Sequence, residues 1–354
     1  MKFNALILFT IISLACTAKD HSKLKDYLLH HSYTIDLNSD SAFNMLPTLM
    51  KGKNVLVLGE GGSHKLPLYT TLKPALINQL AKQNLKYYII EWSRATAMLI
   101  NNYLQSKNKN CPDELEPLCG LCNKLKPIIE RGHEFKVVGI DFEFCGDLHT
   151  EMQLLFGKTN LDVLPHSKEL LRDLLSNRYK NVFRKKFKEF YLVEQAKFCQ
   201  DSVAIRKELG EKYDELRYLL TNPNTTYPGI DRNGGLAENL QSELTPLDTS
   251  AAYLVDVGLA HSIPSESYSM MHKIYRNDTL RQRTIIMNLH CWNCTLNGEN
   301  LDATVLNFLK GDVLDCFTSA TNTTLTLFDL SELPDEYSYI KESGDLLLFA
   351  KDLH

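Results

Sequence analysis

Six short apolar segments constrain the fold of this 354-residue chain more strongly than any other feature of its sequence. Each segment is five to seven residues long and rich in Val, Ile, Leu or Tyr, which is typical of a strand buried on both faces. The segments are 54–58, 86–90, 136–140, 253–259, 284–289 and 345–349.

Helical patterns follow the first two segments. Leucines recur at every fourth residue from Leu68 to Leu80, which predicts a helix that Pro74 should kink or split. A second helix is expected at 93–105. Strands that alternate with helices in this way predict an α/β fold with a mainly parallel central sheet flanked by helices.

The domain organisation follows from where the strand-like segments stop. Residues 147–245 contain long helical patterns of mixed charge and no good strand, so we predict a helical insertion that forms a cap. The α/β core is then expected to comprise 54–146 and 246–354, preceded by an N-terminal helical segment at 19–53.

Residues 1–18 are expected to be a signal peptide. A basic Lys2 precedes an apolar stretch at 5–15, which is too short to span a bilayer. Cleavage after Ala18 would release a periplasmic or secreted protein. Cleavage before Cys16 would leave a cell-surface lipoprotein, and this lipid is the one membrane contact that we expect.

Eight cysteines remain after the signal peptide, and disulfide bonds are the default expectation for an exported protein. Two CxxC pairs, at 119–122 and 291–294, leave a structural zinc site as an alternative. The net charge is −4 and the pI is about 6.3, so no nucleic-acid partner is expected. The basic, aromatic stretch at 178–198 is expected to be a solvated helix, with a membrane-surface or anion-binding helix as the alternative.

Ionisable residues stand at the ends of the apolar segments. Glu60, Glu91 and Asp141 each follow one segment closely, His64 lies four residues after Glu60, and His261 follows a fourth segment. Ligands of parallel α/β sheets bind beyond the carboxyl ends of the strands. We therefore expect these side chains to meet at one edge of the sheet and to form a site.

The residue types in this set are suited to proton transfer. A histidine held by a carboxylate can take a proton from water near neutral pH, and a second histidine or an arginine can stabilise an oxyanion. Neither the GxSxG motif of serine hydrolases nor the HExxH motif of zincins occurs. The set therefore favours an activated water over a nucleophilic serine.

The order of these motifs resembles that of the erythromycin esterase-like family over roughly residues 50–350. The matching stretches are Gly59-Glu60 with His64, YYIIEW with Glu91, KVVGIDFE with Asp141, IDRNGGLAENL with Arg232 and Asn239, and YLVDVGLAHS with His261. The resemblance implies a hydrolase that opens a small-molecule ester or lactone by water attack, with no required metal or other cofactor.

The resemblance also implies a role for each matching residue. His64 would be the general base, oriented together with the water by Glu60 and Glu91. Arg232 and His261 would bind the carbonyl oxygen or the carboxylate that forms. Asp141 and Asn239 are predicted to contact the substrate.

Two alternatives remain open. The acids could hold a divalent ion together with His64 and His261, in a metal-dependent hydrolase. The chain could instead be a non-catalytic binding or surface protein that keeps the fold. The family's Glu-to-His spacing is one residue shorter than here. Its second histidine after the fourth strand, in a His-Asn-x-His pattern, is absent, because the sequence runs His261-Ser262-Ile263-Pro264.

Overall fold

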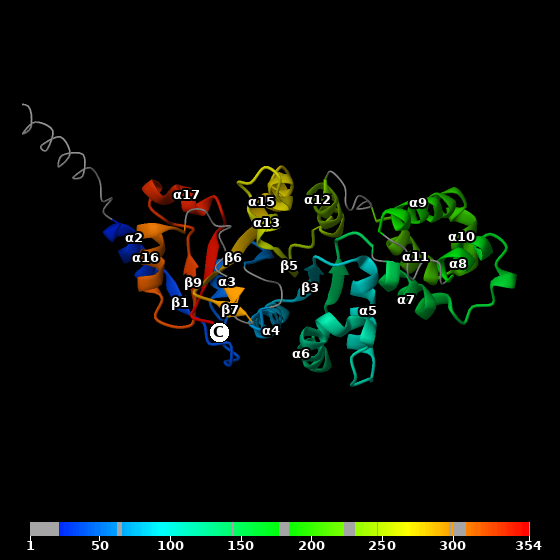
Figure 1. The fold of residues 1–354 in the computed structure, drawn as a ribbon, viewed down its shortest axis with the longest axis horizontal. Coiled ribbons are helices and arrows are strands. Elements are labelled where there is room, and N and C mark those ends of the chain that lie inside the picture. Colours follow the sequence, from blue (N-terminus) through cyan, green and yellow to red (C-terminus); the bar gives the residue numbers. More distant parts are fainter. Residues whose placement is uncertain are drawn as a thin grey trace, which may run out of the picture.

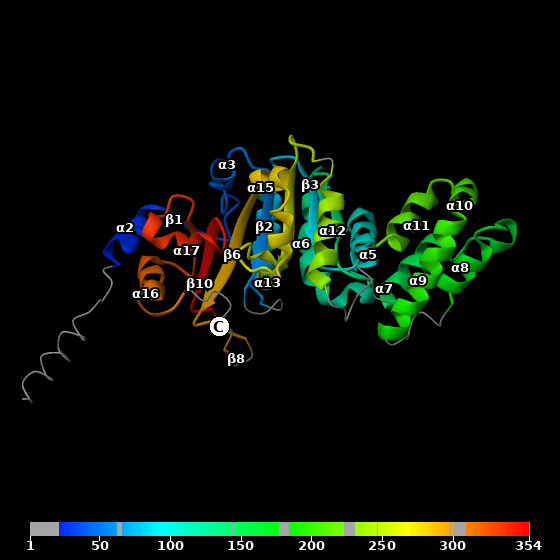
Figure 2. The same ribbon diagram turned by 90° about the horizontal axis from the view of Figure 1, so that it is seen from above.

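The computed structural model describes residues 21–61, 66–143, 145–176, 184–222, 231–245, 247–296, 299–300 and 309–353. Its centre is a twisted sheet with helices on both faces, and a helical lobe extends from one end (Figures 1 and 2). The α/β class and the mainly parallel sheet that the sequence predicts are confirmed.

The central sheet has eight strands in the order β1-β9-β10-β6-β2-β5-β3-β4. Five successive pairs from β10 to β4 are parallel, whereas β9 runs antiparallel to both of its neighbours. The strands are β1 Ser32–Thr34, β2 Val55–Glu60, β3 Leu85–Ile90, β4 Lys136–Gly139, β5 Ala252–Gly258, β6 Thr284–Trp292, β9 Leu325–Asp329 and β10 Leu346–Lys351. A separate two-stranded pair comprises β7 Thr295–Leu296 and β8 Glu299–Asn300.

Each face of the sheet buries its own set of helices. One face packs against α4, α5 and α6, and the other packs against α12, α14 and α15. A third apolar cluster joins β9 and β10 to α2, α16 and α17. These helices are α2 Ser22–His30, α4 Tyr69–Ala81, α5 Arg94–Gln105, α6 Cys119–Glu130, α12 Arg232–Glu243, α14 Met270–Ile274, α15 Asp278–Arg283, α16 Gly311–Ala320 and α17 Ser338–Lys341. Shorter elements are α3 Leu46–Leu49, α13 Leu259–Ser262, η1 Asp113–Leu118, η2 Leu161–Val163 and η3 Asp335–Tyr337.

The alternation of side chains along the strands decides which residues face α4, α5 and α6. Leu58, Ile90 and Leu254 belong to the apolar cluster on this face, and Val57 and Val255 belong to the cluster on the other. Because side chains alternate with a period of two, residues two positions from the first group lie on the same face. Glu60 and Asp256 are therefore placed on the α4–α6 face.

Helix α4 continues through Pro74 as one element, so the helix is not split. Proline lacks an N–H donor, but the leucine face is retained: Leu72, Leu76 and Leu80 are fully buried. Packing of this face against the sheet outweighs the loss of one helical hydrogen bond.

The helical segment that we expected to form a cap lies mainly beside the sheet. Helices α7 (Cys145–Phe156), α8 (Lys168–Leu174), α9 (Arg184–Gln200), α10 (Ser202–Leu209) and α11 (Lys212–Leu220) form the lobe at the β4 edge (Figure 1). They share an apolar core that reaches Ala95 of α5. Helix α12, from the same predicted insertion, packs instead on the sheet.

The N-terminal segment contains strand β1 as well as helices α2 and α3, so it is not wholly helical. One disulfide bond joins Cys111 to Cys119. No helix within the described residues is both long and apolar enough to cross a membrane. The signal-peptide prediction, Cys16 included, lies outside the described residues.

Candidate active site

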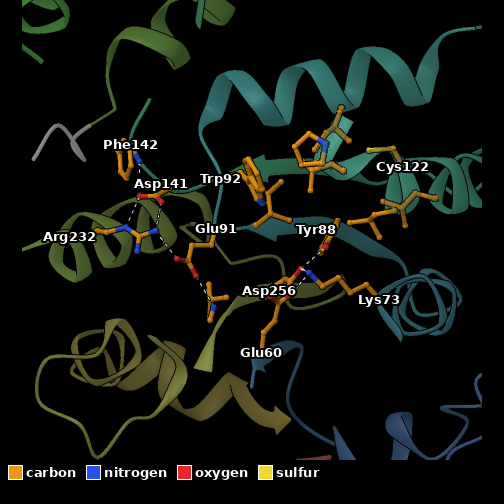
Figure 3. A pocket seen from close by; sticks show the side chains of 18 residues that line it. Glu60, Lys73, Tyr88, Glu91, Trp92, Cys122, Asp141, Phe142, Arg232 and Asp256 are labelled. Atoms are coloured by element: carbon orange, nitrogen blue, oxygen red, sulfur yellow. Dashed lines mark hydrogen bonds and ion pairs between the residues drawn. The ribbon is translucent and has the colours of Figure 1, made fainter. Parts of the chain in front are cut away.

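A cavity of about 500 Å³ opens at the carboxyl ends of β2, β3, β4 and β5 (Figure 3). Its lining includes four carboxylates and two cationic side chains, which come from different elements of the chain. These are Glu60, Glu91, Asp141 and Asp256, with Lys73 and Arg232. Positions up to 196 residues apart in the sequence are thus brought to one cavity, as expected for the strand ends of a parallel sheet.

The first group of charged side chains is the Arg232 cluster, which we define as Glu91, Asp141, Arg232 and His261. Arg232 is the first residue of α12, whose N-terminus lies beside the ends of β3 and β4. Its Nη2 donates to Glu91 Oε1 at 2.7 Å and also to Asp141 Oδ2, and its Nε donates to Asp141 Oδ1 at 3.2 Å. One guanidinium therefore bridges two carboxylates from neighbouring strand ends.

His261 completes the Arg232 cluster from α13. Its Nε2 lies 3.2 Å from Glu91 Oε1 and 3.4 Å from Arg232 Nη1. On the opposite side of the ring, Nδ1 lies 2.5 Å from Asn233 Oδ1. Both ring nitrogens of His261 are therefore engaged by neighbouring side chains.

The surroundings of Glu91 favour its ionised form. Burial alone would raise the pKa of this carboxyl, but hydrogen bonds from His261 and Gly258 N–H and the charge of Arg232 outweigh that effect. Together they lower the pKa of Glu91 to about 2. For Asp141, burial outweighs the nearby Arg232, and its pKa is raised.

The second group is the Lys73 cluster, which we define as Glu60, Lys73, Tyr88 and Asp256. Lys73 reaches from α4 to the sheet, where its Nζ contacts Glu60 Oε1 and lies 2.8 Å from Asp256 Oδ2. Tyr88 on β3 donates its hydroxyl to the same Asp256 oxygen at 2.6 Å. All four side chains line the cavity, and Figure 3 shows three of them meeting at Asp256.

In this cluster burial favours a protonated carboxyl. Burial of Asp256 and the charge of Glu60 raise its pKa to about 7, although Lys73 opposes the shift. The pKa of Lys73 is itself raised, because Asp256 and Glu60 outweigh the effect of burial on the ammonium. The Lys73 cluster therefore holds a carboxyl that exchanges a proton near neutral pH, whereas Glu91 stays ionised.

An apolar wall faces these charged groups. It is formed by Ile100 of α5, Pro117 and Leu118 of η1, and Leu121, Cys122 and Leu125 of α6. The disulfide bond Cys111–Cys119 joins the start of α6 to the segment that leads into η1. Trp92 stands between the wall and the Arg232 cluster in Figure 3. The cavity thus presents a charged side and a hydrocarbon side to a ligand.

Four of the residues singled out in the sequence line the cavity, and a fifth contacts them. Glu60, Glu91, Asp141 and Arg232 are in the lining, and His261 bonds to Glu91 behind it. His64 lies outside the described residues, between Gly61 and Leu66.

Asn239 lies elsewhere than its predicted contact with the substrate suggests. It is fully buried, its Oδ1 accepts from Arg94, and its Nδ2 donates to Ile140 O and to Asn222 Oδ1. It therefore fastens α12 to the end of β4 and to the helical lobe, and it is not among the residues that line the cavity.

Sequence reasoning missed Lys73, Tyr88 and Asp256. A signal for Asp256 was present, because a charged residue inside the apolar segment 253–259 must be paired or neutralised once buried. The sequence signal for Lys73 was weaker, since a lysine next to the buried leucines of a helix usually points to solvent. Its partner Asp256 lies 183 residues away in sequence, so only the fold reveals the pair.

Lys73 also bears on the metal-dependent alternative. A cation shared by two buried carboxylates is required here, and the lysine ammonium already occupies that position between Glu60 and Asp256. Within the described residues, no three His, Cys, Asp or Glu side chains are grouped so that they could hold a metal ion. Lys73 thus supplies the positive charge next to Glu60 and Asp256, and His64 of the metal-dependent alternative lies outside the described residues.

Comparison with known proteins identifies the fold. The chain superposes on a protein from Bacillus cereus with a TM-score of 0.65 and 12% identity, over 94% of this chain and 97% of that one. It superposes on a mutant of the erythromycin esterase EreC in its open conformation with a TM-score of 0.59 and 13% identity, over 92% and 96% of the two chains.

A succinoglycan biosynthesis protein is similar to the same degree, with a TM-score of 0.60 and 13% identity over 95% of this chain and 98% of that one. No family model matches the chain, and no curated protein sequence is significantly similar to it. The expected likeness to the erythromycin esterase fold is confirmed, and at these identities the likeness concerns the fold.

Proposed function

We propose that this protein is an exported hydrolase that cleaves an ester or lactone by attack of an activated water molecule. The observation that supports the proposal is the meeting of Glu60, Glu91 and Arg232 in the lining of one cavity with an apolar wall, with His261 bonded to Glu91 behind them. The erythromycin esterase in the comparisons has the same fold, which is consistent with ester chemistry at this edge of the sheet.

In the proposed mechanism, His64 is the general base, because it follows Glu60 by four residues at the end of β2. It takes a proton from water as the resulting hydroxide attacks the carbonyl carbon. The protonated imidazole then gives this proton to the leaving alkoxide, and the products are a carboxylic acid and an alcohol.

We assign stabilisation of the oxyanion of the tetrahedral intermediate to Arg232, which lines the cavity, with support from His261 behind it. Glu91 bonds to both side chains, so we assign it to positioning them rather than to holding water. Asp141 also holds the guanidinium, by accepting from Nε and Nη2. Donors held in this way need no reorganisation when charge develops on the substrate, which is the main requirement of an oxyanion site.

Lys73 has a corresponding positioning role for Glu60. Its ammonium lies between Glu60 and Asp256 and holds the former at the end of β2, next to the segment that carries His64. Loss of the ammonium would leave two buried carboxyl groups in contact, one of which must then be neutral.

The test is hydrolysis of a panel of nitrophenyl esters and aliphatic lactones by the wild-type protein and by His64→Ala. We expect turnover of at least one member by the wild type and a loss of at least about 100-fold in the variant, whose circular dichroism should be unchanged. Equal turnover by a folded His64→Ala protein would contradict the proposal.

A second candidate function has an observation in its favour. Glu91 and Arg232 are held by hydrogen bonds to one another and to Asp141, His261 and Gly258. A network that fixes the side chains in this way suits a rigid binding site as well as a catalytic one. A protein that binds small molecules without turning over any compound of the panel would fit this second function.

A further inference from the structure

The balance of charge around the cavity bears on what it can bind. Among the described lining residues, carboxyl groups outnumber cationic side chains by four to two. When all four carboxyl groups are ionised, the lining therefore carries two negative charges in excess. A cleft lined by one sign of charge next to apolar walls attracts ligands of the opposite sign.

Each of the two cations is already shared by two carboxyl groups, so neither is left over to balance a ligand that carries a full negative charge. Lys73 is shared by Glu60 and Asp256, and Arg232 is shared by Glu91 and Asp141. An anionic ligand would have to compete with two carboxylates for each cation, and it would be desolvated beside the rest. Like charges brought together in a region of low dielectric repel strongly.

One acceptor on the charged side is unfilled. Asp256 is 4% exposed, and its Oδ1 has no hydrogen-bond partner among the described residues, whereas its Oδ2 accepts from both Tyr88 and Lys73. An unpaired buried carboxylate oxygen is unfavourable, and nearby positive charge relieves it. This atom is a second feature of the cavity that favours a cation over an anion.

The opposite side of the cavity supplies burial for hydrocarbon. Leu125 and Cys122 are almost fully buried, and the half-buried Leu118 and Leu121 continue the wall. The volume of about 500 Å³ is within the range of sites for small organic molecules. Burial against this wall contributes roughly 25 cal/mol for each Å² of apolar surface removed from water.

We propose that the cavity selects ligands that combine an apolar body with a positive charge, and that it discriminates against anionic ligands of the same shape. The charged group lies beside the carboxylates of the two clusters, and the hydrocarbon lies against the α5–η1–α6 wall. The inference rests on the proposed function only in naming the substrate as a cationic ester or lactone, since binding alone tests the selectivity.

The test is isothermal titration calorimetry with three six-carbon probes whose head groups are cationic, neutral and anionic. These are hexyltrimethylammonium, 1-hexanol and hexane-1-sulfonate, none of which has a bond that an esterase cleaves. We measure at pH 8, where Asp256 is ionised, because its pKa is raised only to about 7. The charges of the two ionic probes do not change with pH.

We expect hexyltrimethylammonium to bind at least about tenfold more tightly than the sulfonate, with 1-hexanol between them, and the preference should weaken in high salt. Equal or tighter binding of the sulfonate would overturn the proposal, and so would failure of the cationic probe to bind at millimolar concentration. Failure of the hydrolase assay would leave this result untouched.

Two variants locate the selectivity. Asp256→Asn should reduce the preference for the cation about fivefold, because it removes one of the two excess charges. Leu125→Ser should weaken binding of all three probes to a similar extent. Asp248→Asn, at the opposite end of the strands and half-exposed, is the matched control and should leave all three affinities unchanged. Should Asp256→Asn fail to fold, the ranking of the probes with the wild type still decides the question.

Discussion

The Arg232 cluster and the Lys73 cluster contain similar charged groups, but the pKa values of Glu91 and Asp256 are shifted in opposite directions. Each places one cation between two carboxylates at the ends of parallel strands. Glu91 accepts hydrogen bonds from His261 and from Gly258 N–H, and its pKa falls to about 2. Asp256 is deeper and lies beside Glu60, and its pKa rises to about 7. The number of donors and the depth of burial, and not the residue type, set the ionisation of each carboxyl group.

The difference suits a division of labour within one cavity. The Arg232 cluster keeps a fixed pattern of charges, which is what an oxyanion site needs. The Lys73 cluster holds a carboxyl that gains or loses a proton around neutral pH, next to the segment that carries the predicted base. Five substitutions separate these roles.

Lys73→Met should have the largest effect. It leaves Glu60 and Asp256 buried together without their shared cation, and breaking a buried ion pair from one side costs about 3–5 kcal/mol. The free energy of unfolding in urea measures the loss. Lys273→Met is the matched control, because Lys273 pairs with the exposed Asp231 and its loss should cost about 0–1 kcal/mol. Equal effects of the two substitutions would contradict the burial argument.

Arg232→Met comes next and acts on turnover. If the guanidinium stabilises the oxyanion, kcat for the best ester of the panel should fall about 100-fold or more, which corresponds to about 2.7 kcal/mol. Arg281→Met removes an arginine that is paired on the surface with Asp278 and serves as the control. A fall in kcat of less than threefold for Arg232→Met would assign that residue to structure alone.

Glu91→Gln and Asp256→Asn should change the pH dependence of stability with opposite signs. The folded-state pKa of Glu91 is lowered to about 2, so its stabilisation is present above pH 4–5 and is lost as the pH falls towards 2. Glu91→Gln should remove this loss of stability at acidic pH, which is on the order of 2–3 kcal/mol.

For Asp256 the order of the two pKa values is reversed. The folded-state pKa is raised to about 7, so between about pH 4 and pH 7 the unfolded state releases a proton that the folded state keeps. Stability therefore falls as the pH rises through this window, and Asp256→Asn should remove the fall. Urea titrations at intervals from pH 3 to pH 8 measure both effects, and slopes of the same sign would contradict the contrast between the clusters.

Tyr88→Phe should have the smallest effect. The ring remains packed in the sheet, and one hydrogen bond of 2.6 Å to Asp256 is lost, which costs about 1–2 kcal/mol. The unfolding free energy is the readout, and Tyr87→Phe on the same strand, with its more exposed side chain, is the control. No change for Tyr88→Phe would mean that its hydroxyl contributes nothing to holding the carboxyl group.

Much of this architecture could be predicted from the sequence, because buried parallel strands leave a local signature. The runs at 54–58 and 253–259 correspond to β2 and β5, and their ends place Glu60 and His261 near one edge. Strands β1 and β9 were missed, since each is short, pairs antiparallel and lacks a long apolar run.

The site was predicted in part for a related reason. Strand ends can be found locally, so Glu91, Asp141, Arg232 and His261 could be named, and the structure brings them into contact. The Lys73 cluster depends on pairing between α4 and β5, which no local pattern encodes. The segment 147–245 is predicted to be a cap over the site, because its sequence shows that it is helical but does not show where it packs.

The contrast between a permanently ionised carboxyl group and a proton-exchanging one in a single cavity is tested most directly by carbon-13 NMR. Carboxyl carbons of labelled protein are followed from pH 3 to pH 9, and Glu91→Gln and Asp256→Asn assign the two signals. We expect the Glu91 signal to remain that of a carboxylate across the range, and the Asp256 signal to move with a midpoint near pH 7. Midpoints for both groups between pH 3.5 and pH 4.5, as in free side chains, would contradict the account.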